Sequence, residues 1–194
     1  MPSFADVETT RKALSHLLYE HWVSHELFRW QWWLSVVLLL VPWLVWIRFV
    51  DTRRLFEMLV YASCIGITAS ILDVIGTSLA LWGYRQRLVW FMYPPLLPID
   101  LSIIPVVFTL VYQLCPTWSR FVSVVAILGI LASCVEPLFT WADIYQSYDW
   151  SPLYSIPIYV LLASGAKWGV QRLLSIEEKS RSVAARSAMR RPHR

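Results

Sequence analysis

Acidic side chains interrupt several apolar runs of this 194-residue sequence, and four of them are candidates for chemistry: Asp73, Asp100, Glu136 and Asp143. A carboxylate near the centre of a bilayer costs roughly 2.5 to 3.5 kcal/mol on insertion scales, so such residues persist where protein or a function offsets that cost. A carboxyl group kept away from water tends to hold its proton, and a protonated acid can transfer that proton to a substrate. Proton donation inside a membrane is therefore the first chemistry that these residues suggest.

The elements that carry these acids are long apolar segments. Hydrophobic residues make up 57% of the chain and charged residues only 15%, whereas soluble domains carry about 25% charged residues. Runs long enough to cross roughly 30 Å of hydrocarbon lie at about 30–50, 56–82, 95–115, 121–145 and 153–174. The twelve Trp and nine Tyr residues gather near the ends of these runs, as in the aromatic belts of membrane interfaces. The sequence therefore predicts an all-α, polytopic integral membrane protein with five transmembrane helices.

The chain divides into an N-terminal interfacial helix at 1–29, a five-helix transmembrane domain at 30–174 and a basic cytoplasmic tail at 175–194. The first part opens with a helix-capping pattern and carries a partial apolar face that suits a membrane surface. His21 and His25 are four residues apart, a spacing that lets two imidazoles reach one ion. Because no third ligand is identifiable, no metal site is predicted.

Basic residues are unevenly divided between the two sides of the predicted spans. Five Lys and Arg residues fall on the side of the N-terminus and twelve on the side of the C-terminus. Because basic loops remain in the cytoplasm, we expect a multi-pass protein of the cell membrane with its N-terminus outside and its C-terminus inside. Lys167, in the inner half of the fifth run, is expected to extend toward the cytoplasmic interface. The four acids then fall in the outer half of the membrane.

Small residues share a helix face with two of the acids. In the second run, positions 62, 66, 69, 76 and 80 are Ala or Gly and lie on the face of Asp73. In the fourth run, positions 126, 129, 133 and 140 are small residues on a face shared by Glu136 and Asp143. Small residues let helices approach closely in lipid, so Asp73 and Glu136 are predicted to face protein. Pro137 is expected to bend the fourth helix beside Glu136.

The acids are expected to form one polar site surrounded by aromatic rings. Asp73 and Glu136 are predicted to act as the acid and its orienting partner, with Asp100 as a third catalytic member. Aromatic faces stabilise a desolvated cation by roughly 0.5 to 2 kcal/mol each, which suits a carbocation intermediate. The predicted substrate-binding residues are Trp82, Trp90, Tyr93, Trp141, Tyr145 and Asp143.

Each of these residues also has a purely structural interpretation. Asp100 can cap the N-terminus of the third helix, and Asp73 or Glu136 can hydrogen-bond to a neighbouring helix without any catalytic role. Asp143 lies close enough to the interface to be solvated, and the aromatic residues are typical of a membrane belt. The sequence leaves these alternatives open.

Four segments carry a resemblance to a known family: "VDTRRLFEMLVYA", "ILDVIGTSLALWGY", "PPLLPIDLSIIPVVFTLVYQ" and "VEPLFTWADIYQSYDWSPLYSIPIY". They resemble small five-span membrane proteins of Gram-positive spore-forming bacteria over nearly all of 30–174. That resemblance implies a topology and no activity. A looser similarity, in architecture and residue types alone, links the chain to the integral-membrane terpene cyclases of meroterpenoid and indole-terpenoid pathways. It implies cyclisation that is started by a proton.

These features predict an acid-initiated membrane terpene cyclase whose polyprenyl substrate arrives from the lipid. The expected partners are the lipid bilayer and a hydrophobic prenyl-type small molecule, with no cofactor and no nucleic acid, and a homo-oligomer is left open. A proton- or cation-coupled transporter or channel is one alternative. A non-catalytic membrane adaptor, in which the acids only hold helices together, is another, and it predicts that amide variants lower stability without removing an activity.

Overall fold

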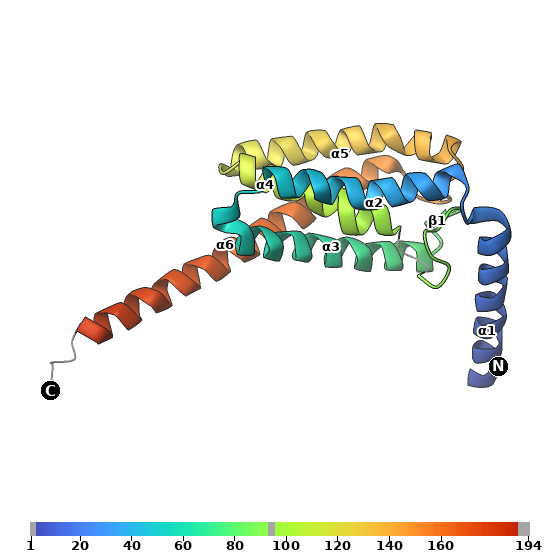
Figure 1. Cartoon of the computed structure of the whole chain (residues 1–194), viewed down its shortest axis with the longest axis horizontal. Helices are drawn as coiled ribbons and strands as arrows, with labels where there is room; N and C mark the ends of the chain where they lie inside the picture. Colours follow the sequence, from blue (N-terminus) through green and yellow to red (C-terminus); the bar gives the residue numbers. More distant parts are fainter. Residues whose placement is uncertain (1–2, 93–95, 190–194) are drawn as a thin grey trace.

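The computed structural model describes residues 3–92 and 96–189, with side chains described as far as Ser182. Most of this part of the chain is helical (Figure 1). The α-helices are α1 (Phe4–His21), α2 (Trp30–Phe49), α3 (Leu55–Ser78), α4 (Ile104–Leu114), α5 (Trp118–Trp141) and α6 (Pro152–Met189). The π-helical turns η1 (Trp22–Glu26) and η3 (Ile99–Ile103), the 3-10 turn η2 (Thr52–Arg54) and the strands β1 (Trp82–Tyr84) and β2 (Tyr145–Ser147) lie between them.

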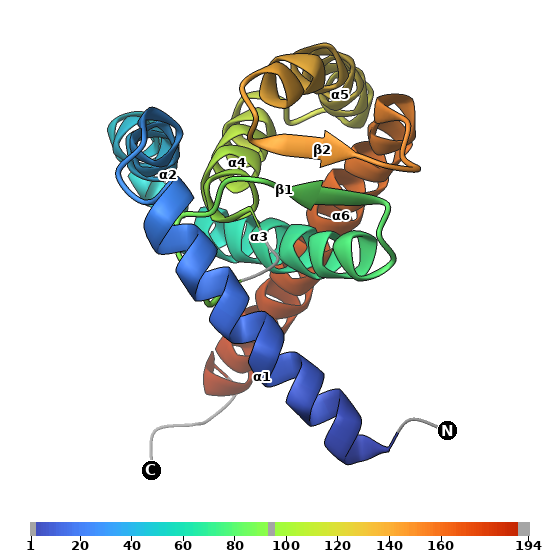
Figure 2. The same cartoon turned by 90° about the vertical axis from the view of Figure 1, so that its right-hand side faces the viewer.

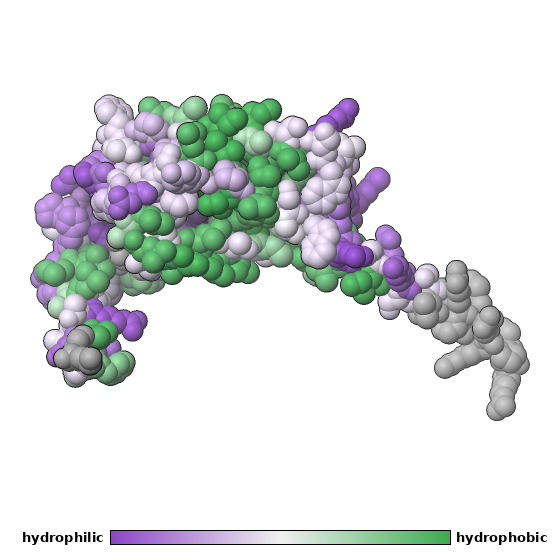
Figure 3. Space-filling model, turned by 180° about the vertical axis from the view of Figure 1, so that it is seen from behind, coloured by the Kyte–Doolittle hydropathy of each residue, from purple (hydrophilic) through white to green (hydrophobic). Residues whose placement is uncertain are grey.

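Helices α2 to α6 run alongside one another as a bundle, whereas α1 lies crosswise at one end of it (Figure 1, Figure 2). At the opposite end, α6 continues beyond the bundle (Figure 1). The space-filling view shows an apolar band across the middle of the bundle, with more polar residues toward both of its ends (Figure 3). This distribution is typical of a hydrocarbon layer between two interfaces.

Three helices are long and apolar enough to cross a membrane: Trp30–Phe49, Thr52–Ser78 and Trp118–Trp141. They correspond to the first, second and fourth runs of the sequence, so the expectation of membrane-type helices is confirmed for these three. The third run forms the shorter apolar helix Ile99–Leu114, and the fifth run forms the first part of α6. Helix length and composition therefore support three membrane-type helices, two fewer than the five spans that the sequence predicts.

The small-residue face of α3 packs against the rest of the bundle, as its spacing predicts. The members of this face within α3 are all buried, and they are Ala62, Gly66, Ala69, Asp73 and Gly76. A Cβ atom on Gly66 would lie 3.3 Å from Pro105 Cγ and 3.4 Å from the Asp100 carbonyl oxygen. The segment that contains η3 and α4 therefore lies directly on α3. Ala80 departs from the prediction, because α3 has already ended and Ala80 is exposed with a φ of 55°.

The small-residue face of α5 packs against α6. A Cβ atom on Gly129 would lie 3.4 Å from Ile156 Cα, and the Ser133 hydroxyl donates to the Pro152 carbonyl oxygen at 2.9 Å. Helix α5 continues through Pro137 as far as Trp141. The prediction that Asp143 shares this face is wrong, because Asp143 lies beyond the helix with a φ of 61°.

The expectation of an all-α chain is wrong in one detail, since β1 and β2 form a small antiparallel sheet. Trp82 pairs with Ser147, Gly83 with Gln146 and Tyr84 with Tyr145. The strands directly follow α3 and α5, whose C-terminal ends lie at the same end of the bundle (Figure 1, Figure 2). The segments that follow α3 and α5 are thus held together by backbone hydrogen bonds.

Lys167, which the sequence analysis expected to extend toward the cytoplasmic interface, is only 1% exposed, so protein covers its charged end. Its Nζ atom donates to the carbonyl oxygens of Cys115 and Pro116 at 2.9 and 3.2 Å, and it lies 4.2 Å from the centroid of the Phe121 ring. These carbonyls belong to the end of α4, where unpaired carbonyl groups attract a cation. Lys167 therefore fastens α6 to the junction between α4 and α5.

Replacing Lys167 by Met should lower the stability of the folded bundle, because the carbonyl oxygens of Cys115 and Pro116 lose their donor. The expected cost is about 1 to 3 kcal/mol, seen as a lower thermal midpoint of the detergent-solubilised protein. Lys179→Met is the matched control, since Lys179 is exposed on the same helix. Equal midpoints for the two variants would contradict this role of Lys167.

Candidate functional site

Asp73, near the C-terminal end of α3, accepts three hydrogen bonds from groups that follow α3 in the chain. The Trp82 Nε1 atom and the Tyr84 hydroxyl donate to its Oδ1 atom at 2.7 and 2.5 Å. The Leu96 amide donates to its Oδ2 atom at 3.0 Å. Both oxygens of this buried carboxyl group are thus occupied by donors, an arrangement that favours a negatively charged acceptor over a proton donor.

Tyr84 supports this arrangement from β1. Burial, together with the nearby Asp73 carboxylate, raises the pKa of Tyr84 well above its usual range. Its hydroxyl group therefore stays protonated at neutral pH and remains available as a donor to Asp73.

Asp100 lies in η3, and its carboxyl group neighbours that of Asp73. Its side chain is buried, and among the described residues its Oδ2 atom has no hydrogen-bond partner. Within 3–92 and 96–189, the ion pairs of the structure involve neither Asp73 nor Asp100. Two adjacent buried carboxyl groups without a cation are stable together when one of them carries a proton.

Glu136 joins the same region from α5. It is half-buried, and its Oε1 atom is enclosed without a hydrogen-bond partner in the described part of the chain. Tyr145, in β2, is its polar neighbour, and Tyr159, in α6, lies within electrostatic range of Glu136, Asp73 and Asp100. The structure therefore places the three predicted catalytic acids within electrostatic range of Tyr159, with Asp100 beside Asp73 and Tyr84 bonded to Asp73.

These acids and their tyrosine neighbours are called the acid–tyrosine cluster below: Asp73, Asp100, Glu136, Tyr84, Tyr145 and Tyr159. Two of the predicted aromatic residues, Trp82 and Tyr145, lie at this cluster. The Trp82 indole donates to Asp73 and packs edge-on against Trp150, with ring centroids 4.9 Å apart. It also lies over Gly76, where an added Cβ atom would come within 2.0 Å of Cη2. Glycine is needed at position 76 because the indole occupies the space of a side chain.

The other predicted lining residues lie elsewhere. Trp141 is 84% exposed, and Trp90 packs edge-on against Tyr19 of α1, with centroids 5.4 Å apart. Asp143 forms an exposed ion pair with Arg85 at 2.5 Å. Tyr93 lies outside the described residues. The aromatic surroundings of the acids are therefore narrower than the sequence suggested.

A buried ion pair that sequence reasoning missed joins the N-terminal part to the loop after β1. Glu26, which is 1% exposed, forms a salt bridge with Arg87 and also accepts from the Arg87 backbone amide at 2.7 Å. The Trp22 and Trp32 indoles donate to the carbonyl oxygens of Arg87 and Leu88 at 3.1 and 2.9 Å. No short-range pattern could have found these contacts, because Glu26 and Arg87 are 61 residues apart.

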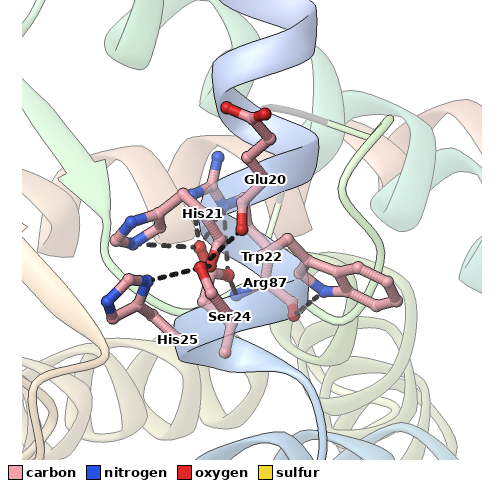
Figure 4. Close-up of polar contacts among 7 residues, drawn as sticks. Glu20, His21, Trp22, Ser24, His25 and Arg87 are labelled. Atoms are coloured by element: carbon pink, nitrogen blue, oxygen red, sulfur yellow. Dashed lines mark hydrogen bonds and ion pairs between the residues drawn. The ribbon is translucent and has the colours of Figure 1, made fainter.

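Figure 4 shows the surroundings of this ion pair. The rings of His21 and His25 stack with centroids 4.9 Å apart, and the Ser24 hydroxyl contacts His25 Nδ1 at 2.7 Å. His21 Nε2 lies 3.6 Å from the Glu26 carboxylate. Among the described residues, no group of three or more His, Cys, Asp and Glu side chains is placed to hold a metal ion.

A cavity of about 10 Å³ lies beside the segment that leads to Asp100, and it has roughly the space for one water molecule. It is lined by Ser35, Leu38, Leu96, Pro98, Ile99, Phe139 and Ile144. A larger hollow of about 380 Å³ lies on the surface between α1 and Trp90, and its lining contains none of the acids of the cluster.

Gly76→Ala should disturb the cluster without changing any polar residue. The new methyl group would collide with the Trp82 indole, so the Trp82 hydrogen bond to Asp73 should weaken and the fold should lose about 1 to 3 kcal/mol. Gly169→Ala is the control, because a Cβ atom there meets no other atom within 4 Å. Thermal midpoints and tryptophan fluorescence would measure the effect, and a Gly76→Ala variant as stable as the control would contradict this packing.

The amide variants of Asp73 and Asp100 should differ in stability. In the Asp73→Asn variant the amide NH₂ group would face one of the three groups that donate to Asp73. This variant should therefore lose about 2 to 3 kcal/mol of folding free energy. An amide at position 100 can donate to Asp73 in place of a carboxyl proton, so Asp100→Asn should cost less than about 1 kcal/mol. Thermal midpoints of the two variants, measured in the same detergent, would test this order of stability. An Asp100→Asn variant less stable than Asp73→Asn would refute the assignment of Asp73 as the structural acceptor.

The chain was also compared with known proteins. No protein-family model, no curated protein and no solved structure matches it. What the acid–tyrosine cluster does must therefore be inferred from its own residues and contacts.

Proposed function

We propose that the chain spans the cell membrane five times, with the acid–tyrosine cluster in the outer half of the bilayer. The supporting observation is that Ile99–Leu114 and the first part of α6 run alongside the three long apolar helices (Figure 1, Figure 2). The distribution of Lys and Arg places the N-terminus outside and the C-terminus in the cytoplasm.

The N-terminal helix α1 fits the outer membrane surface in this arrangement. It has no buried residue, and it lies crosswise to the bundle (Figure 1). Phe4, Val7, Leu14 and Leu17 are exposed on it, and a helix in the interface would insert such side chains among the lipids. The Glu26–Arg87 ion pair would hold the end of this helix at the level of the headgroups.

The proposed activity is the acid-initiated cyclisation of a prenyl-type lipid. The observation that carries it is the buried Asp100 carboxyl group, whose Oδ2 atom has no hydrogen-bond partner among the described residues. An alkene is a very weak base, so its protonation needs a group that donates a proton and does not only accept hydrogen bonds. Asp73 already accepts three hydrogen bonds, whereas the neighbouring Asp100 carboxyl group is the member of the pair that is placed to carry the proton. The proposed roles of the two residues are therefore exchanged relative to the sequence-based expectation.

In the proposed reaction Asp100 transfers its proton to a terminal alkene carbon or epoxide oxygen of the substrate. The carbocation that results is attacked by the next double bond, which forms a carbon–carbon bond and moves the positive charge along the chain. Loss of a proton from the last cation to Glu136, the third acid of the cluster, gives a cyclic isomer of the substrate. Negative charge on Asp73 and the ring faces of Tyr84 and Trp82 would stabilise the cations.

Transport of a proton or a cation is a second candidate, favoured by the two neighbouring buried carboxyl groups of Asp73 and Asp100. Its difficulty is the opposite end of the bundle, where Glu57 and Lys167 are already engaged. Glu57 pairs with Arg54 and accepts from Tyr112, and Lys167 is bound to backbone carbonyls. A path across the membrane would need further carriers between the two ends.

Mass spectrometry of lipids from membranes that contain the wild-type chain tests the proposed activity, with linear polyprenols and their terminal epoxides as substrates. The wild type should form a cyclic product with the mass of its substrate, and Asp100→Asn should reduce that product by about 100-fold or more. Asp149→Asn, which changes an exposed carboxylate at the same end of the bundle, should leave it unchanged. If the folded wild-type chain forms no product from any of these substrates, the proposed cyclase activity is refuted. Proton flux in liposomes would then test the transport candidate.

A further inference from the structure

Two histidine rings are stacked where α1 joins η1. The rings of His21 and His25 have centroids 4.9 Å apart and an interplanar angle of 16°. His21 is the last residue of α1 and His25 lies in η1, so the stack bridges the two elements (Figure 4). Imidazole is the side chain that ordinarily changes its charge between about pH 5 and 8. A change of pH in this range therefore acts on the junction between α1 and η1.

The hydrogen bonds of Ser24 show where His25 takes up a proton. The Ser24 hydroxyl oxygen lies 2.5 Å from the Glu20 carbonyl oxygen and 2.7 Å from His25 Nδ1. A carbonyl oxygen only accepts, and a hydroxyl group carries a single proton. Ser24 therefore donates to Glu20, and His25 Nδ1 donates to Ser24. The Nε2 atom of the neutral His25 ring is then the atom that is protonated when the pH falls.

Acidification makes the charge at this junction positive. Glu26 faces the stack from η1, 3.6 Å from His21 Nε2, and it is already paired with Arg87 of the loop after β1. The next carboxylate along α1, that of Glu20, lies 3.5 Å from His16 Nδ1. At neutral pH the charges of Glu26 and Arg87 cancel. With both rings of the stack protonated, the junction holds three cations, Arg87 and the two rings, for one buried carboxylate.

Helix α1 is the element that this charge can move. It has no buried residue, and among the described elements it packs mainly against η1. The turn that follows it has unusual backbone geometry, because η1 is π-helical and Phe28, just after it, has a φ of 60°. Strained backbone of this kind gathers at switch regions and other functional sites. The junction therefore combines a weakly held helix with a turn that is suited to rearrange.

We infer that the His21–His25 stack is a pH-operated latch that fixes the angle between α1 and the bundle. While at most one ring is charged, the stack is closed and α1 lies crosswise at the end of the bundle (Figure 1). When both rings are protonated, they repel each other and are repelled by Arg87, so the rings separate, η1 rearranges and α1 swings away. The Glu26–Arg87 pair keeps the turn attached to the loop after β1. The latch is independent of the proposed activity, because it contains no member of the acid–tyrosine cluster.

The distance between two spin labels, measured by pulsed electron paramagnetic resonance on the reconstituted full-length chain, tests the latch. The labels are attached at Ala5→Cys on α1 and Trp141→Cys at the end of α5, two exposed positions. The native cysteines are replaced by alanine: Cys64→Ala, Cys115→Ala and Cys134→Ala. Position 5 lies about 24 Å from His21 along α1, so a swing of about 15° displaces its label by about 6 Å. The distance should therefore shift by about 6 Å or more between about pH 7.5 and about pH 5.

Variants of the stack separate charge from packing. His21→Gln and His25→Gln each remove one of the two charges, so either variant should keep the neutral-pH distance at about pH 5. His16→Gln is the matched control, because His16 is exposed on α1 outside the stack, and it should shift as the wild type does. A wild type without the shift, a shift that persists in either stack variant, or a shift lost in the control would overturn the latch. A stack variant that is already displaced at neutral pH would overturn it too, because ring packing would then set the angle of α1.

Discussion

The carboxylate of Asp73 is the contact on which the end of the bundle that carries β1 and β2 depends. Its two oxygens accept from β1, through Trp82 and Tyr84, and from the backbone at Leu96, just before η3. One side chain on α3 thus fixes the strand that follows it and the start of the next helical segment. Pairing of β1 with β2 then holds Tyr145 beside Glu136, so the remaining acids are placed by the same contact.

The hydrogen bonds to Asp73 also give Asp73 and Asp100 different surroundings. Asp73 is surrounded by donors, which stabilise negative charge, whereas Asp100 is buried with an oxygen that no described group contacts. Because a second negative charge beside Asp73 would be costly in a dry environment, the pair is suited to hold a single proton on Asp100. Two residues of the same type therefore differ in the hydrogen bonds that reach them.

Much of this arrangement could be predicted from periodicity. The spacing of Ala62, Gly66, Ala69 and Gly76 placed Asp73 on a buried face, and it did so correctly because one continuous helix carries all of them. The same reasoning failed for Ala80 and Asp143, since each lies just past a helix end, where the helical period no longer applies.

Contacts between distant segments could not be predicted in this way. The Leu96 amide is a backbone group without a sequence signal, and Glu26 and Arg87 carry opposite charges but no shared pattern. Trp141 belonged to the expected lining by residue type, yet its position on α5 turns it outward. Which aromatic residues surround the acids depends on how helix ends meet, and a single sequence does not encode that locally.

The central claim, that Asp100 holds a proton beside a charged Asp73, is tested most directly by infrared spectroscopy of the reconstituted chain at neutral pH. A protonated carboxyl group gives a carbonyl stretching band that shifts when H₂O is replaced by D₂O. The wild type should show such a band, and the Asp100→Asn variant should lack it. A wild type without the band, or a band that persists unchanged in the variant, would contradict the assignment of Asp100 as the acid.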